Sequence, residues 1–160
     1  MSTNQPIDPS TDMSMRRSLC TFWLAGLCFG VDVLDVQEVI RHQEVTPVPL
    51  APQVVVGLMN LRGQIITSCD LRIRLDLGER SPGQVPMNVV VRTGEGPVSL
   101  LVDEIGDVIQ VADDTFETPP STVTGVARDL IVGAYKLDGK LLLELDIVRL
   151  INGLAVTVDA

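Results

Sequence analysis

The side chains best suited to catalysis are few in this chain and stand apart from one another. The only histidine, the residue most used in general acid–base chemistry, is His42 beside an arginine, which favours a surface or structural role. The carboxylate pairs Asp103-Glu104 and Asp113-Asp114 are adjacent in sequence, so in a strand their side chains would point to opposite faces. We predict that these acids are solvated. No nucleophile-elbow, phosphate-loop or zinc-protease motif occurs, and the sequence therefore argues against an enzyme.

The three cysteines give no sign of a metal or disulfide site. Cys20, Cys28 and Cys69 show no C-x-x-C spacing, and their odd number argues against a disulfide framework. A reducing cytoplasm is the simpler interpretation, and the cysteines are predicted to be small buried hydrophobic residues. We predict no metal site and no cofactor.

A carboxylate and a guanidinium are better candidates for a functional contact. Glu38 is predicted on a short helical turn over residues 35–38, for which Asp35 is a possible cap, and Arg62 is predicted at a hairpin tip. In a small closed barrel the two corners could meet, and the pair would then fix the loop geometry. The alternative is that each side chain is separately solvated, with little effect on stability. Spacing alone leaves both open.

An internal repeat singles out Arg62. The segment Val54–Leu75 reappears 76 positions later as Leu130–Ile151, with glycine, leucine and aspartate positions shared. At the turn the second copy has Asp138-Gly139, an ordinary tight-turn pair, whereas the first has Arg62-Gly63. Since the scaffold does not need an arginine there, Arg62 is the first residue suspected of a function.

A second block repeats in the same order. Phe29–Ile40 matches Val98–Ile109 at an offset of 69 positions. Two blocks repeated in order predict two half-domains of similar build, the alternative being a chance likeness of β-rich stretches.

About ten short strands, with turns every 8–12 residues, predict an all-β fold of barrels or a sandwich. The apolar run 18–31 follows two arginines, as in a signal peptide, but we interpret it as a strand pair around Ala25-Gly26. It is also too short to span a bilayer. Short helices are predicted after Asp70 and after Asp146, and an irregular stretch over residues 113–127.

Charge excludes one class of partner. The chain has 12 basic and 21 acidic residues, a net charge of −9, of which residues 81–160 carry 5 − 12 = −7. An acidic chain without a basic face repels phosphate backbones, so no nucleic-acid partner is expected. The uneven charge suggests that the two halves present different surfaces to different partners.

With these residues in hand, the chain resembles the CheW family, the adaptors of bacterial chemosensory arrays. The resemblance covers about residues 18–152 and rests on a combination of motifs. These are Phe29-Gly30-Val31-Asp32-Val33, Val36-Gln37-Glu38-Val39-Ile40, Thr46-Pro47-Val48-Pro49, Gly57-Leu58-Met59-Asn60-Leu61-Arg62-Gly63-Gln64, Asp70-Leu71-Arg72, Leu101-Val102-Asp103-Glu104-Ile105 and Leu145-Asp146.

The resemblance implies two intertwined five-stranded SH3-like β-barrels around a shared core, with short helices. The expected boundaries are a disordered tail over 1–17, a CheW-like domain over 18–154 with barrels over about 18–80 and 81–154, and a C-terminal tail over 155–160.

The resemblance also implies a non-catalytic role in the cytoplasm, without direct membrane insertion. The expected partners are the regulatory domain of a CheA-type histidine kinase, which packs end to end with the adaptor, and the cytoplasmic tip of chemoreceptors, which docks between the barrels. The partner-binding residues implied by the motif positions are Val36, Glu38, Gly57, Asn60, Arg62, Val102 and Val108.

Two departures from the family pattern leave the pathway open. Thr67-Ser68-Cys69 stands where the family commonly has proline and two aliphatic residues, which makes this strand end more polar. Glu144 replaces the first aspartate of the usual Leu-Asp-Leu-Asp. The alternatives are an adaptor of a divergent pathway for pili, surface motility or development, a β-barrel that carries a small hydrophobic ligand, or a self-assembling structural protein.

Overall fold

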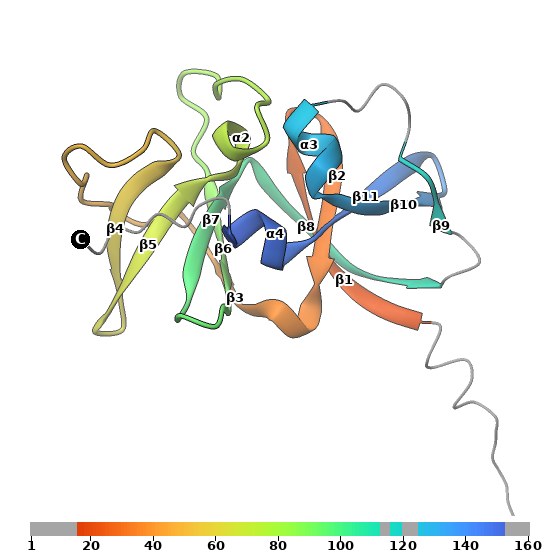
Figure 1. Cartoon of the computed structure of the whole chain (residues 1–160), viewed down its shortest axis with the longest axis horizontal. Coiled ribbons are helices and arrows are strands. Elements are labelled where there is room, and N and C mark those ends of the chain that lie inside the picture. The colour runs from red at the N-terminus through yellow and green to blue at the C-terminus, as the bar shows by residue number, and fades with distance from the viewer. Residues whose placement is uncertain (1–15, 113–115, 120–124, 153–160) are drawn as a thin grey trace, which may run out of the picture.

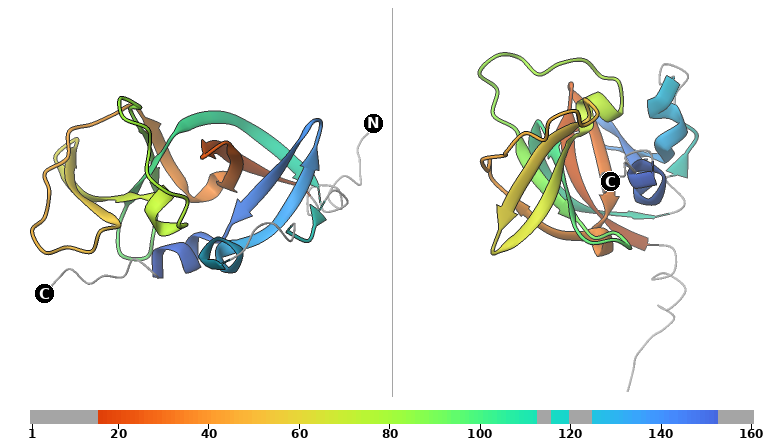
Figure 2. Two further views of the ribbon diagram at one scale, coloured as in Figure 1. Left: turned by 90° about the horizontal axis from the view of Figure 1, so that it is seen from above. Right: turned by 60° about the vertical axis from the view of Figure 1, so that its left-hand side comes forward.

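The computed structural model describes residues 16–112, 116–119 and 125–152, which form two β-barrels side by side along the long axis (Figures 1 and 2). We call one of them the central barrel, because its strands come from the middle of the sequence, and the other the terminal barrel, because it contains the first and last strands. The central barrel has the strand order β3-β6-β7-β5-β4, with β3 (Val36–Ile40), β4 (Val55–Leu61), β5 (Gln64–Asp70), β6 (Met87–Val91) and β7 (Val98–Val102). The terminal barrel has the order β8-β1-β2-β11-β10-β9, with β1 (Arg16–Leu24), β2 (Leu27–Asp32), β8 (Glu104–Ala112), β9 (Phe116–Glu117), β10 (Ile131–Leu137) and β11 (Lys140–Leu145).

Each sheet closes in the same way. Thr46, beyond β3, pairs with Leu58 of β4 through two backbone hydrogen bonds of 2.8 Å. In the terminal barrel β9 follows β8 in the chain and pairs with β10, where Glu117 lies opposite Ala134. The two-residue β9 therefore closes a terminal barrel of five longer strands, as the segment at Thr46 closes the central barrel. The predicted all-β fold of two SH3-like barrels is confirmed.

The barrels exchange strands between the two sequence repeats. The first repeat unit contains β1 to β5, but its β1 and β2 join the terminal barrel while β3, β4 and β5 build the central one. The prediction of one barrel over 18–80 and the other over 81–154 is therefore wrong. For the link between β7 and β8 the reason is its length: these strands are joined by Asp103 alone, which is shorter than the two-residue loop of the tightest hairpin.

The register of the parallel strands shows that the repeat is structural. Phe29 of β2 lies opposite Leu143 of β11. The first repeat offset relates Phe29 to Val98 of β7 (29 + 69), and the second relates Leu143 to Thr67 of β5 (143 − 76). Val98 and Thr67 are also cross-strand partners. The two barrels are thus built on the same pairing, and the predicted half-domains of similar build are confirmed.

Three apolar clusters make up the core. The largest lies between the barrels and joins Phe22 and Phe29 of the terminal barrel to Val89 and Leu100 of the central one. A smaller cluster fills each barrel, around Tyr135 in the terminal barrel and around Met59 in the central one. The shared cluster is capped by buried residues of α2 (Leu71–Arg74) and α4 (Ile147–Asn152), which is the shared core expected from the resemblance.

The cysteines behave as predicted. All three are buried and free of disulfides. Burial raises the pKa of each thiol, and that of Cys69 reaches about 12 with a further contribution from neighbouring Asp70.

Several local predictions need correction. The helical turn lies at η1 (Val33–Asp35), capped by Asp32, so Glu38 belongs to strand β3. Residues 16 and 17 of the predicted tail belong to β1, and the apolar run forms the β1–β2 hairpin as interpreted. Within the predicted irregular stretch a helix, α3 (Gly125–Leu130), begins. The predicted tails over 1–15 and 155–160 lie outside the described residues.

Candidate partner-binding surface

The turn between β4 and β5 holds an arginine in an unfavourable backbone conformation. Arg62 has φ 53° and Gly63 has φ 85°, so both central residues of the turn are left-handed, as in a type I′ hairpin. Asn60 supports the turn, because its Oδ1 accepts a hydrogen bond of 2.9 Å from the Gly63 N–H. Asp138, the equivalent of Arg62 in the second repeat, does not have a positive φ. An arginine at a position that favours glycine or asparagine points to a role outside the fold.

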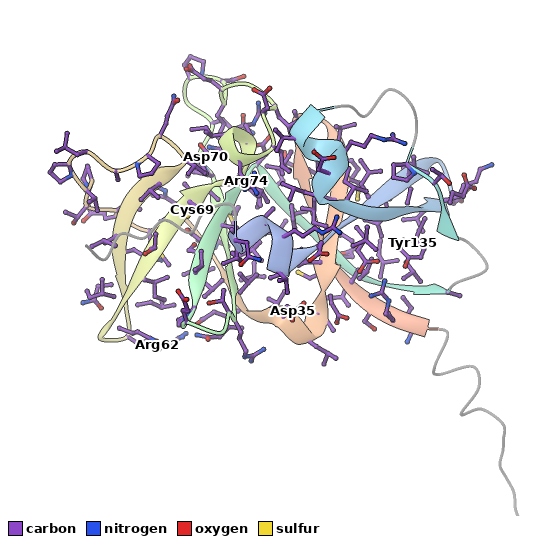
Figure 3. The ribbon with its side chains drawn as sticks, in the orientation of Figure 1. Asp35, Arg62, Cys69, Asp70, Arg74 and Tyr135 are labelled. Carbon is purple, nitrogen blue, oxygen red and sulfur yellow. The ribbon has the colours of Figure 1, made fainter. Side chains whose placement is uncertain are left out.

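Of the two alternatives left open by the sequence, the structure has the ion pair. Arg62 Nη1 lies 2.5 Å from Glu38 Oε2, which reaches the turn from β3. The hydrogen bond from Arg62 lowers the pKa of the Glu38 carboxyl and raises that of the guanidinium, so both groups stay charged near neutral pH. The Arg62 side chain is still 71% exposed, and it lies at the end of the central barrel (Figure 3). The ion pair therefore fixes the position of the Arg62 guanidinium while leaving it exposed to solvent.

An exposed apolar side chain lies beside Asn60 on the same hairpin. Ile65 is 61% exposed and lies opposite Asn60. Val39 is also exposed, but it follows Glu38 in β3, so its side chain points to the opposite face of the strand. We call Glu38, Asn60, Arg62 and Ile65 the corner surface. Apolar contact area around a fixed arginine is typical of the centres of protein interfaces.

The other implied site residues lie elsewhere. Gly57 is buried beneath Thr46, and a Cβ atom there would lie 2.2 Å from the Thr46 carbonyl oxygen, so this glycine is needed to close the barrel. Val102 is fully buried in the shared core and offers no surface. Val36 is half-buried against the same core. Val108 is 60% exposed, on β8 of the terminal barrel. Of the implied residues, the structure gathers only Glu38, Asn60 and Arg62 at one corner.

A buried polar cluster was not foreseen. Asp103 was predicted to be solvated with Glu104; Glu104 is exposed, but Asp103 is only 7% exposed, so that half of the prediction is wrong. Its carboxylate accepts hydrogen bonds from the Arg72 and Arg80 side chains and from the Ala25 backbone N–H. The Asp70-Leu71-Arg72 motif contains the donor Arg72 and the Val102-Asp103-Glu104 motif contains the acceptor Asp103, which is the signal that could have revealed the cluster.

These hydrogen bonds lower the pKa of Asp103. Burial alone would raise the pKa, but the bonds from Arg72, Ala25 and Arg80 outweigh it and bring it to about 2. A carboxyl with a depressed pKa stabilises the fold above the pKa of the unfolded chain, about 3.9, and loses that contribution as the pH falls towards 2. We expect Asp103→Asn to cost about 2 kcal/mol of unfolding free energy at pH 7 and progressively less below pH 4. Urea titrations of both proteins from pH 7 to 2.5 measure this, and a constant difference would contradict it.

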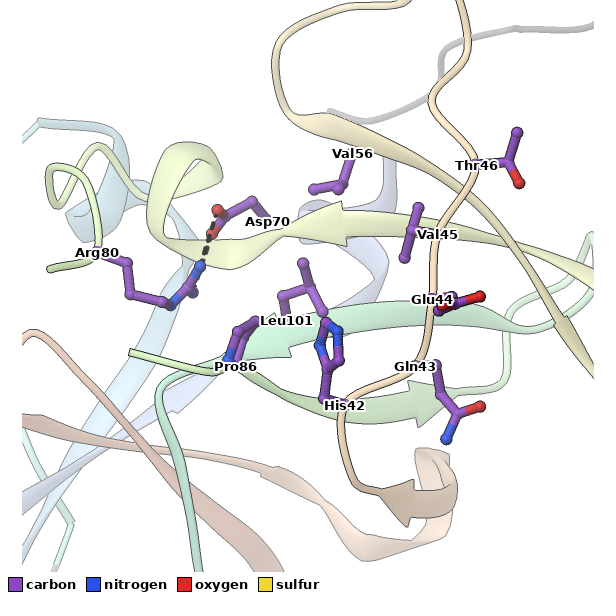
Figure 4. Close-up of a pocket in the computed structure, with 10 residues that line it drawn as sticks. All are labelled: His42, Gln43, Glu44, Val45, Thr46, Val56, Asp70, Arg80, Pro86 and Leu101. Atoms are coloured by element: carbon purple, nitrogen blue, oxygen red, sulfur yellow. Dashed lines mark hydrogen bonds and ion pairs between the residues drawn. The ribbon is translucent and has the colours of Figure 1, made fainter. Parts of the chain in front are cut away.

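A hollow opens beside this cluster in the central barrel (Figure 4). Its volume is about 590 Å³, and its lining includes His42, Val45, Val56 and the Asp70–Arg80 ion pair. His42 is exposed, in keeping with the surface role predicted for it. The charges of Asp70 and Arg80 in this lining are already paired with each other. Among the described residues no group of histidine, cysteine, aspartate or glutamate side chains could hold a metal ion.

A family model described as a CheW-like domain matches residues 18–155. This chain belongs to the CheW family. It is 31% identical to the chemotaxis protein CheW of Treponema pallidum over 138 residues, covering 84% of this chain and 81% of the relative. It is 30% identical to that of Rhizobium meliloti, covering 81% and 85%. The crystal structure of the scaffolding protein TtCheW from Thermoanaerobacter tengcongensis matches with a TM-score of 0.73 and 30% identity, covering 82% of this chain and 90% of that one.

The CheW family is a family of non-catalytic scaffold proteins, and membership in it supports a scaffold role in chemotaxis for this chain. In the described part of the chain no helix has the length and apolar character needed to cross a bilayer. The corner surface and the Asp103 cluster are thus features of a CheW scaffold.

The departures from the CheW pattern lie inside the barrels. Ser68 is fully buried in β5, and its Oγ is the one buried side-chain N or O atom of the described residues that has no hydrogen-bond partner. β5 pairs with both β4 and β7, so the polar strand end lies inside the sheet and not at its edge. Glu144 is buried in the terminal barrel, where it accepts hydrogen bonds from Arg17 and from the Tyr135 hydroxyl.

The unpartnered hydroxyl leads to a prediction. Removing a buried polar group that makes no hydrogen bond recovers its desolvation cost, so Ser68→Ala should stabilise the protein by about 1 kcal/mol. Chemical denaturation of the two proteins measures the difference. Ser99→Ala is the matched control: Ser99 is also fully buried but donates a 2.8 Å hydrogen bond to Asn88 Oδ1, and its loss should destabilise. Loss of stability in Ser68→Ala would contradict the prediction.

Proposed function

We propose that this chain couples chemoreceptors to a histidine kinase of the CheA type in the cytoplasm, within receptor arrays at the inner membrane. The observation that carries the proposal is the corner surface. An ion pair fixes Arg62 at a strained turn, and the repeat shows that the fold itself does not require an arginine there. Family membership supports the same role, since its relatives are named as chemotaxis proteins.

We assign the corner surface to the regulatory domain of the kinase. That domain resembles the adaptor and is expected to pack against it end to end, and Arg62 of the corner surface lies at the tip of a hairpin of the central barrel, at the edge of the molecule (Figure 3). The Glu38–Arg62 pair would set the register of the contact, while Ile65 would supply apolar area.

We assign the receptor tip to a surface that includes β8. Val108 is 60% exposed on this strand, and β8 follows the crossing from the central to the terminal barrel, so its start lies where the barrels meet. A helical hairpin bound there would touch both barrels.

Pairwise binding tests the proposal. A purified receptor fragment containing the helical tip and a purified kinase regulatory domain are each titrated with the full chain by calorimetry, and then together. Saturable binding of both fragments, with neither displacing the other, is the expected result. Binding of neither fragment would overturn the proposal, and mutual displacement would overturn the assignment of two separate surfaces.

A further inference from the structure

The chain crosses between the barrels at two places that are equivalent in the repeat. The first crossing is η1, between β2 and β3, and the second is Asp103, between β7 and β8. Every partner surface that involves both barrels depends on the angle at these crossings. The second crossing consists of one residue, and that residue carries a buried charge.

Asp103 is bonded to both barrels. Its backbone N–H donates a 3.0 Å hydrogen bond to the Trp23 carbonyl in β1, and its Oδ2 accepts one of 2.9 Å from the Ala25 N–H in the β1–β2 turn. Both partners belong to the terminal barrel. From the other side, Arg72 of α2, which follows β5 of the central barrel, donates from Nε at 2.8 Å to Oδ1 and from Nη2 at 2.6 Å to Oδ2.

The two arginines are themselves held in place. Arg80 donates from Nε to Asp103 Oδ1 at 3.0 Å and from its other two nitrogens to both oxygens of Asp70. Arg72 Nη1 donates to the Glu79 carbonyl at 3.0 Å. The Arg72 and Arg80 side chains are only 12% and 11% exposed. Two carboxylates and two guanidinium groups thus form a neutral cluster with fixed, forked geometry. We call Asp70, Arg72, Arg80 and Asp103 the crossing network.

Among the described residues, no comparable network of ion pairs surrounds the first crossing. The position equivalent to Asp103, at 103 − 69, is Leu34, which is 79% exposed. That crossing is held by Arg92, which donates from its backbone to the Asp35 carbonyl and from Nη1 to the Leu34 carbonyl. The position equivalent to Arg72, at 72 + 76, is Val148, which is 68% exposed. Since one crossing forms without such a network, the fold does not require it, and its presence at the other needs a different explanation.

We propose that Asp103 is a positioning residue, which fixes the orientation of the two barrels relative to each other through the crossing network. If the proposed function holds, the loss of this orientation affects binding of one partner and not of the other. A receptor tip that touches both barrels depends on this orientation, whereas a kinase domain bound at the corner surface of one barrel does not.

The orientation is measured on the protein without partners. Ile65→Cys in the central barrel and Val132→Cys in the terminal barrel replace exposed residues, and the three native cysteines are buried and do not take a spin label. Pulsed electron spin resonance then gives the distribution of distances between the labels. In Asp103→Asn the distribution is expected to broaden or shift, while Glu104→Gln, a change at the adjacent exposed carboxylate, leaves it unchanged. An unchanged distribution in folded Asp103→Asn would overturn the proposal.

A second variant keeps the test usable if Asp103→Asn does not fold. Arg72→Lys keeps the charge but lacks the fork, so the same broadening is expected from a smaller perturbation. If neither variant folds, as judged by reaction of Cys28 with a thiol reagent, the network serves stability and the proposal is wrong. In folded Asp103→Asn and Arg72→Lys proteins that keep Ile65 and Val132, receptor binding is expected to weaken at least about fivefold with kinase binding unchanged. Failure of the wild-type chain to bind any partner would remove the proposed function but leave the orientation result standing.

Discussion

Replacing Gly57 by alanine is expected to lower the free energy of unfolding by about 3 kcal/mol and the melting temperature by about 8 °C. The added Cβ would lie 2.2 Å from the Thr46 oxygen and 2.6 Å from Val45 Cγ1. Because the first of these atoms is backbone, relief requires the strand to move. That movement breaks the two hydrogen bonds between Thr46 and Leu58 that close the central barrel.

The control is a glycine in open space. Gly94 lies in the β6–β7 loop and does not have a positive φ, and a Cβ atom added there would have no atom within 4 Å beyond its own chain neighbours. Gly94→Ala is therefore expected to change stability by less than about 0.5 kcal/mol. Thermal and urea denaturation of both variants provide the comparison. If Gly57→Ala were as stable as Gly94→Ala, Gly57 would not be needed for closure, and a direct contact with a partner would become the better explanation of the motif.

The second large effect is expected at Arg62, on binding rather than on folding. Arg62→Ala removes the guanidinium from the corner surface and should weaken binding of the kinase regulatory domain about tenfold or more. Arg62→Asn sharpens the test, because asparagine before glycine favours the type I′ turn. This variant should be at least as stable as the wild type while binding as poorly as Arg62→Ala.

The equivalent turn of the terminal barrel supplies the control. Asp138→Asn makes a comparable change at the β10–β11 turn and should leave affinity for the kinase domain unchanged. Glu38→Gln removes the charge that orients Arg62 and should give an intermediate loss. Equal losses of affinity and melting temperature across the Arg62 variants would make this arginine a structural residue and contradict the assignment.

Much of the fold could be predicted because the sequence contains its pattern twice. The paired hairpins, the aspartate caps at Asp70 and Asp146 and the unusual arginine at the first turn all follow from aligning the copies. The exchange of strands could not be read in this way. A repeat shows which segments are alike, but it does not show which sheet a strand joins. That depends on whether the link before the strand, such as Asp103 before β8, is long enough to form a hairpin.

The buried network escaped prediction for a related reason. Asp103 finds Arg80 and Arg72 at separations of 23 and 31 residues, so no local period connects them. Adjacent acids in a strand normally include one that faces solvent, and here that is Glu104. Asp103 is the buried acid of the pair because it lies where the chain crosses from the central to the terminal barrel. The same crossing buries Val102, which motif position alone made a candidate contact.

The most direct test of the adaptor role is a three-component retention experiment. The receptor-tip fragment is immobilised, and the kinase regulatory domain is passed over it with and without the full chain. The kinase domain is expected to remain on the surface only when the chain is present, and Arg62→Asn should abolish that retention while the chain itself still binds the receptor. Kinase retention that is the same with and without the chain would contradict the account.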